Sequence, residues 1–111
     1  SDANVSAKLI AGIIIADGMG EVTTTFLHKH GPSKWRHGMS DAMRDQSLNR
    51  LVEYGWIVPA GTNNNATRRP TRYLVNPSVH DLYKHRVEEE RERMAAAREI
   101  AVRIKAGSIG R

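Results

Sequence analysis

The segment 48–57 constrains the fold more than any other part of the chain. It carries two leucines three residues apart, as on one face of a helix, and then Gly55, a residue type that commonly ends helices. The apolar run Trp56–Val58 follows at once and has the β-branched residues typical of a strand. A helix that turns directly into a strand predicts a fold that combines helices with a small sheet.

Three helices are expected up to this turn. Apolar side chains recur at helical spacing over Val5–Ala16, and Asp17-Gly18 ends the pattern, so we expect a first helix that buries one face. Gly12 and the β-branched residues Ile13–Ile15 argue against a helix, because both residue types have low helix propensity. A strand is the alternative, although about twelve residues is long for a strand. The second helix is expected from Thr23 or Thr24, either of which can be its N-cap, to Gly31-Pro32, and the third from about Ser40 to Tyr54, with a polar, basic connection over 33–38.

A β-hairpin is expected after the third helix. Its strands are predicted over 56–58 and 71–75, and the Asn- and Thr-rich segment 61–70 between them has no apolar periodicity and is predicted to be a loop. Asn76 then caps a final helix, with Pro77 in its first turn, where the missing N–H costs nothing.

The final helix is expected from Pro77 to about Lys105, which gives a length of about 40 Å at 1.5 Å per residue. Its apolar residues are mostly three or four positions apart, but Glu90 interrupts the seam, as in a weak coiled coil. We therefore divide the chain into a domain over 1–76 and a C-terminal helix over 77–111 that pairs with a second copy in a homodimer. The alternative is a solvated helix whose first turns pack on the domain and whose end frays.

With this order of elements, the chain resembles the winged helix-turn-helix family. The similarity covers Val22–Asn76, and Val5–Ala16 fits as the first helix of the family. It implies a mainly α fold with a small β-hairpin (α+β), a winged helix-turn-helix with a long C-terminal helix. In this family the third helix enters the major groove of DNA, and the hairpin, or wing, lies along the neighbouring backbone or minor groove.

Two local features bear on this resemblance. Arg72–Pro77 is similar to the end of the winged-helix domains of plasmid and phage replication initiators, although a generic Asn-Pro helix cap explains it equally well. The third helix departs from the family pattern, because its core face projects back onto Arg44, where an apolar residue is usual. Either this helix begins late, near Asp45, or Met39 and Met43 meet another surface.

The charge of the chain favours a polyanionic partner. The sequence has 17 Lys and Arg against 12 Asp and Glu, a net charge of +5. With 5% aromatic residues, stacking on single-stranded nucleic acid is not expected. Double-stranded DNA is the partner that the resemblance to winged helix-turn-helix proteins implies. Phosphate contacts are expected at the turn before the third helix and on the wing, from Lys29, Lys34, Arg36, Arg68, Arg69 and Arg72. The third helix is expected to contribute Met43, Gln46, Ser47 and Arg50 from its polar face, together with the basic Arg44.

The sequence argues against catalytic and metal sites. It has no cysteine, which excludes disulfides, thiol catalysis and thiolate metal sites. Its five histidines lack the spacing that aligns two ligands on one helix face, and those beside lysines are expected to supplement phosphate binding. Gly18-Met19-Gly20 lacks the lysine of a phosphate loop, and no serine has a nucleophile motif. We therefore expect no enzyme activity, metal or cofactor.

The sequence also predicts a cytoplasmic protein, associated with the nucleoid or a plasmid. Its longest apolar run, Leu9–Ala16, is short of the roughly 20 residues that span a bilayer. The N-terminus lacks the basic segment of a signal peptide, and a start at Ser1 rather than Met indicates a processed, trimmed or tag-cleaved product.

Two functions remain open at this point. The first is a sequence-selective double-stranded DNA-binding protein, acting as a transcriptional regulator or as a plasmid or phage replication or partition factor. The alternative is a winged-helix protein–protein interaction module of a larger replication or structural assembly, which would not need basic residues at the wing tip.

Overall fold

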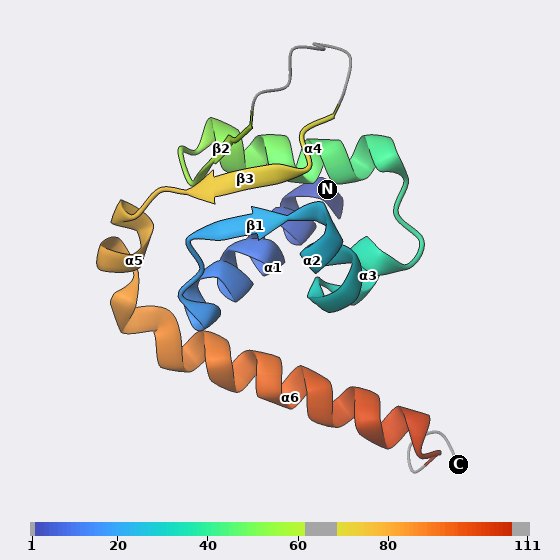
Figure 1. The fold of residues 1–111 in the computed structure, drawn as a ribbon. Coiled ribbons are helices and arrows are strands. Elements are labelled where there is room, and N and C mark those ends of the chain that lie inside the picture. Colours follow the sequence, from blue (N-terminus) through green and yellow to red (C-terminus); the bar gives the residue numbers. More distant parts are fainter. Residues whose placement is uncertain (1, 62–68, 108–111) are drawn as a thin grey trace.

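The computed structural model describes residues 2–61 and 69–107, which form helices around a small antiparallel sheet (Figure 1). The fold is mainly helical with a small sheet, as the sequence predicts. In chain order its elements are α1 (Asp2–Asp17), β1 (Glu21–Thr23), α2 (Thr24–His30), α3 (Ser33–Arg36), α4 (Asp41–Glu53), β2 (Ile57–Pro59), β3 (Arg72–Val75), α5 (Ser78–Leu82), the 3-10 turn η1 (Lys84–Arg86) and α6 (Val87–Lys105). Within the described ranges, no helix combines the length and apolar character needed to cross a membrane.

Helix α1 lies at the centre of the molecule, between α4 and α6. Ile10 and Ile14 are fully buried in the main core, and Ile13 and Ile15 are buried as well, so other elements cover this helix on nearly all sides. The expectation of a single buried face is therefore wrong, and Val5, which was expected to belong to that face, is exposed. A helix enclosed by its neighbours can carry apolar residues all round.

The sheet contains a strand that sequence analysis misses. Its order is β1-β3-β2, all antiparallel, with Glu21 opposite Leu74 and Ile57 opposite Val75. The two expected strands are present, but β1 adds a third, where the sequence suggested only the start of the second helix. β1 is three residues long, too short to show an alternating pattern, and it exists because the edge of β3 pairs with its backbone.

The segment between β1 and α4 begins with a predicted cap and ends with an unpredicted helix. The Thr23 side chain accepts a hydrogen bond from the Phe26 backbone nitrogen at 3.0 Å, which confirms Thr23 as the cap of α2. The connection expected over 33–38 is not merely a polar linker, because it contains the helical turn α3. Trp35 lies on this turn and is 1% exposed, so burial of its indole anchors the segment to the core.

Helix α4 has the bounds that its sequence predicts, within one residue at each end. Ser40 caps it by accepting a hydrogen bond from the Met43 backbone nitrogen at 3.2 Å. Gly55 follows it with φ of +76°, a left-handed conformation that favours glycine. Leu48 and Leu51 are buried in the core, as expected.

The single long helix expected over Pro77–Lys105 is wrong, because the chain bends at Tyr83. This residue ends α5 with φ of −116° and ψ of 16°, outside the helical range. Its ring stacks on Trp56 at 5.2 Å between centroids, and Val79 is buried, so α5 is held against the sheet end of the core. The chain then turns, and α6 crosses α1 (Figure 1).

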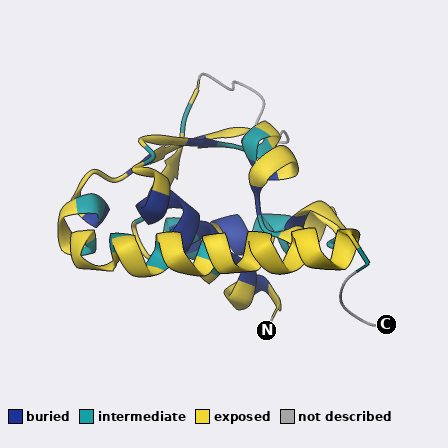
Figure 2. Ribbon diagram, turned by 90° about the horizontal axis from the view of Figure 1, so that it is seen from below, coloured by how far each residue is buried: buried dark blue, intermediate teal, exposed yellow. Residues whose placement is uncertain are grey.

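The crossing of α6 over α1 takes place at Gly12. A side chain at this position would meet Glu90 and Arg93, which form an ion pair at 2.9 Å above it. Arg91 also donates a hydrogen bond to the Ala16 carbonyl at 3.2 Å. Viewed from below, α6 covers the buried centre while its outer face stays exposed (Figure 2). Its last turns extend away from the body of the molecule (Figure 1).

Candidate nucleic-acid interface

Helix α4 presents a polar face to solvent. Ala42, Gln46, Asn49 and Glu53 are exposed and follow one another at steps of four, three and four residues, so they form a stripe along the helix. The opposite side of the helix packs on α1. Gln46 and Asn49 have no side-chain hydrogen bond within the part of the chain that the structure describes. Exposed amide side chains without a partner in the protein can form hydrogen bonds with base edges in DNA, with adenine in particular.

The residues predicted on this face divide between exposed and buried positions. Gln46 is exposed, as expected, but the expectation for Ser47 is wrong. Ser47 is fully buried, because it lies one turn before Leu51 on the core side, and its hydroxyl donates to the Met43 carbonyl at 3.0 Å. Met43 is half-buried. Asn49 was missed, although its spacing of three from Gln46 was a signal that it shares the same face.

Two arginines of α4 serve contacts within the protein. The Arg44 Nε donates to the Trp35 carbonyl at 2.8 Å, and its guanidinium lies 5.9 Å from the centre of the Trp35 ring. This explains the basic residue on the core side of α4, because Arg44 joins α4 to α3. Arg50 is half-buried, and its Nε donates to the Asn4 Oδ1 at 2.9 Å. Neither guanidinium projects freely from the polar face.

The described arginines of the hairpin are paired with carboxylates. Arg69 lies 3.2 Å from Asp41 and 2.8 Å from Asp45, so it ties the end of the wing loop to the start of α4. Arg72 lies 2.7 Å from Glu21 across the sheet. Arg68, the third wing residue expected to contact phosphate, lies outside the described residues. Phosphate contacts through Arg69 and Arg72 would therefore have to compete with these ion pairs.

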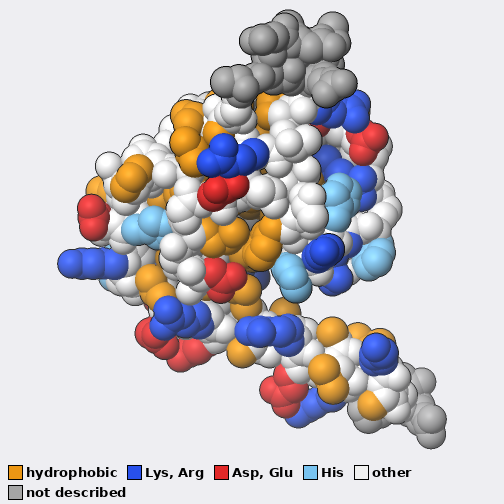
Figure 3. Space-filling view, in the orientation of Figure 1, with side chains coloured by type: hydrophobic (Ala, Val, Ile, Leu, Met, Phe, Trp, Pro, Cys, Tyr) orange, Lys and Arg blue, Asp and Glu red, His pale blue; other side chains and the backbone are white. Residues whose placement is uncertain are grey.

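The three cations expected at the turn before α4 do not form one cluster with the hairpin arginines. Lys34 pairs with Asp2 at 3.2 Å, whereas Lys29 and Arg36 line a groove that faces α6. Figure 3 shows Lys, Arg and His side chains gathered on the side of the molecule formed by α2 and α3. The sequence predicts basic clusters on two sides of the third helix, but Lys29 and Arg36 instead face α6 across the groove.

Two buried groups lie near the start of α4. Burial raises the pKa of the Tyr73 hydroxyl above its ordinary value, and the Asp45 carboxylate raises it further. The Trp35 Nε1 is buried with no hydrogen-bond partner over the described residues. Over the same ranges, no three His, Asp or Glu residues are grouped as ligands of a metal ion.

Comparison of the chain with models of protein families, with curated proteins and with solved structures finds no match.

Proposed function

We propose that the protein binds double-stranded DNA, with the polar face of α4 in the major groove. The observation that carries this proposal is the exposed stripe of Ala42, Gln46, Asn49 and Glu53. None of the described elements covers it, and two of its amide side chains have no described partner. A helix of this size fits the major groove, and its amides supply donors and acceptors for base edges. The net charge of +5 supports a polyanionic partner.

The position of the hairpin next to α4 supports the finer assignment to a winged helix-turn-helix. The helix is followed along the chain by β2 and β3, and Arg69, three residues before β3, forms ion pairs with Asp41 and Asp45 of the helix. In this arrangement the hairpin would lie on the backbone beside the groove. The role would be that of a transcriptional regulator or a plasmid or phage replication or partition factor, in the cytoplasm and associated with the nucleoid or a plasmid.

A protein–protein interaction module is the second candidate, and a specific observation favours it. Arg44, Arg69 and Arg72 make hydrogen bonds or ion pairs within the protein, so less positive charge is free around α4 than the sequence suggests. The outer face of the sheet also exposes the apolar side chains of Val58 and Leu74. Exposed apolar residues near arginines that already have partners within the protein suit a protein partner.

Binding to a random DNA duplex at two salt concentrations distinguishes the two candidates. We expect a complex at low salt whose affinity falls steeply as salt rises, because bound phosphates release counterions. Gln46→Ala with Asn49→Ala should then reduce preference among duplexes selected from a random pool, at a cost of about 1–3 kcal/mol for each lost amide pair. Ser78→Ala, an exposed polar change on α5, is the matched control and should alter neither property. No binding at low salt would favour the protein–protein candidate.

A further inference from the structure

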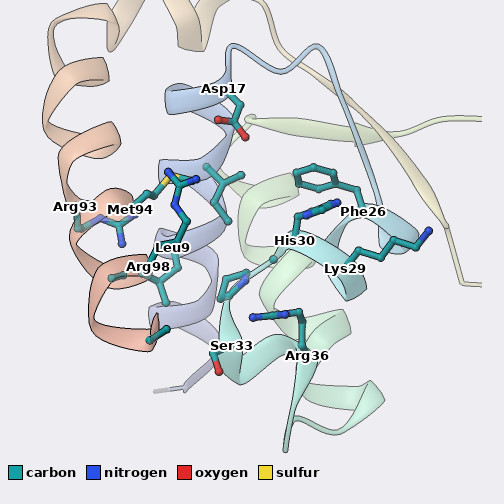
Figure 4. A pocket seen from close by; sticks show the side chains of 15 residues that line it. Leu9, Asp17, Phe26, Lys29, His30, Ser33, Arg36, Arg93, Met94 and Arg98 are labelled. Atoms are coloured by element: carbon teal, nitrogen blue, oxygen red, sulfur yellow. The ribbon is translucent and has the colours of Figure 1, made fainter. Parts of the chain in front are cut away.

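A groove of about 630 Å³ lies between α6 and the body of the molecule (Figure 4). Its apolar floor comes from three helices: Leu9 and Ile13 from α1, Phe26 from α2, and Met94, Ala97 and Ala101 from α6. The proposed DNA contacts of α4 do not involve it. A volume of this size falls within the range of sites for small organic ligands, about 300–1,000 Å³.

The rim of the groove is basic on both sides. Lys29 and Arg36 lie on the α2–α3 side, and Arg93 and Arg98 lie on α6. In Figure 4 Arg36 extends toward the interior of the groove from one wall, and Arg98 lies beside Met94 on the other. Asp17 is a single acidic residue at one end.

Positive charge in the groove is less neutralised than around α4. Arg93 pairs with Glu90, but within the described residues no carboxylate lies within ion-pair distance of Lys29, Arg36 or Arg98. At the hairpin, by contrast, Arg69 alone contacts two carboxylates. An apolar floor beneath unpaired cations is complementary to a molecule with an apolar body and an anionic group.

We propose that this groove binds an amphiphilic organic anion, an aryl or alkyl carboxylate, whose apolar body packs on Leu9, Phe26 and Ala97 and whose carboxylate lies between Arg36 and Arg98. The ligand would contact α1, α2 and α3 on one side and α6 on the other, so its binding would hold α6 against the body. The inference does not depend on DNA binding, because its residues are not those of the α4 face.

The test uses three naphthalene compounds that share one apolar body. Binding of 2-naphthoate, 2-naphthylmethanol and 2-naphthylmethylammonium to the full chain is measured by NMR titration. We expect 2-naphthoate to bind most tightly and to perturb the resonances of Leu9, Phe26 and Ala97. The ammonium compound should bind most weakly. Equal affinities of the three compounds, or perturbation confined to other parts of the chain, would overturn the proposal.

A double charge reversal tests the role of the basic rim, and a bulky substitution tests the role of the space in the groove. Arg36→Glu with Arg98→Glu should weaken 2-naphthoate binding about fivefold to tenfold and change binding of the alcohol less than twofold. Lys84→Glu with Lys105→Glu makes the same change in net charge outside the groove and should have no such selective effect. Ala97→Trp should fill the groove and abolish binding of both compounds.

The groove could instead receive a second copy of the chain or an acidic segment of another protein. Dilution of the protein without any compound addresses the first alternative. If the resonances of Leu9 and Phe26, which lie on the groove floor outside α6, move with protein concentration, the groove is an interface between copies, and the proposal is wrong. An acidic amphipathic peptide addresses the second alternative. If this peptide does not displace bound 2-naphthoate from the groove, the assignment of the groove to a small organic anion is supported. The titration of the wild-type chain with the three compounds can contradict the proposal by itself. The proposal therefore remains testable even if a variant fails to fold.

Discussion

Arg44 shows that a basic residue in this protein can serve the fold. Only 18% of its side chain is exposed, and its guanidinium lies over the Trp35 ring and reaches the Trp35 carbonyl and Asp41. Long basic side chains commonly pack their stems along apolar surface and leave the charged group at an edge. The contact explains why α4 can place an arginine where a purely apolar core face would be expected.

Replacement of Arg44 should therefore affect stability more than replacement of an exposed, ion-paired arginine. We expect Arg44→Ala to lower the free energy of unfolding by about 1–3 kcal/mol, because it removes a charged hydrogen bond to a backbone carbonyl and leaves that carbonyl without it. Arg72→Ala, which removes an exposed pair with Glu21, should cost less than about 1 kcal/mol. Urea denaturation of both variants measures the difference, and equal losses would contradict a bridging role for Arg44.

Tyr73 gives a prediction about alkaline pH. Burial and the Asp45 carboxylate raise its pKa above 10.0 in the folded protein. As pH rises through about 10, the unfolded chain releases a proton from this residue that the folded chain still retains. The free energy of unfolding should therefore fall from about pH 10 until the folded pKa is passed.

Tyr73→Phe removes this ionisation and serves as the comparison. Whatever the variant costs at pH 8, its stability relative to the wild type should improve by about pH 11, since only the wild type loses this contribution. Urea denaturation at the two pH values provides the measurement. A constant difference between the two proteins would show that Tyr73 does not titrate as its burial implies.

At the scale of elements, the position of α6 depends on the absence of a side chain at Gly12. The ends of Glu90 and Arg93 occupy the space that a β-carbon would need. Because both are flexible side chains, a single methyl group can displace them, whereas a larger side chain would push the two helices apart. Gly12 is buried, although glycine is a poor residue for a helix interior.

Gly12→Ala and Gly12→Leu should therefore have different effects. We expect the alanine variant to be within about 1 kcal/mol of the wild type, because the gain in helix propensity offsets the displaced ion pair. The leucine variant should separate α6 from α1 and increase hydrogen exchange across α6 while α4 stays protected. Unchanged exchange in the leucine variant would mean that the crossing does not depend on this glycine.

The parts of the fold that the sequence predicts are those with local signals. The cap at Thr23, the start of a helix near Ser40, the glycine after α4, and the periodic Leu48 and Leu51 each depend on signals within a few residues, and the structure confirms them. The bend at Tyr83 could not be predicted in this way, because it depends on stacking against Trp56, which is distant in the sequence. Tertiary contacts of this kind override helical periodicity.

The candidate site shows the same limit. Exposure of Gln46 follows from the helical pattern, but burial of Ser47 depends on how far the core extends around α4. The ion pairs of Arg69 join residues that are far apart in the sequence, so composition alone counted that arginine as available charge. A list of basic residues cannot show which of them are neutralised inside the fold.

Across the whole molecule, α6 produces an elongated shape, with extents of 53 × 32 × 23 Å. The first half of α6 packs on α1 through contacts such as Arg91 with the Ala16 carbonyl. Its second half carries Ile100, Val102 and Ile104, which are 52%, 65% and 58% exposed. Three large apolar side chains on a projecting helix are costly in water and suit an interface with another chain.

We therefore predict a homodimer in which the second half of α6 forms the main contact. Ile100 and Ile104 are four residues apart and share one side of the helix, so pairing two copies would bury both, as in a short coiled coil. Ile100→Glu with Ile104→Glu should make the protein monomeric at micromolar concentration in a sedimentation experiment. Leu82→Glu places a charge on another exposed apolar residue, on α5, and should leave the dimer intact. These substitutions are a cleaner test than truncation, because removal of α6 would also uncover α1. A wild-type monomer, or a dimer that survives the double substitution, would contradict this assignment.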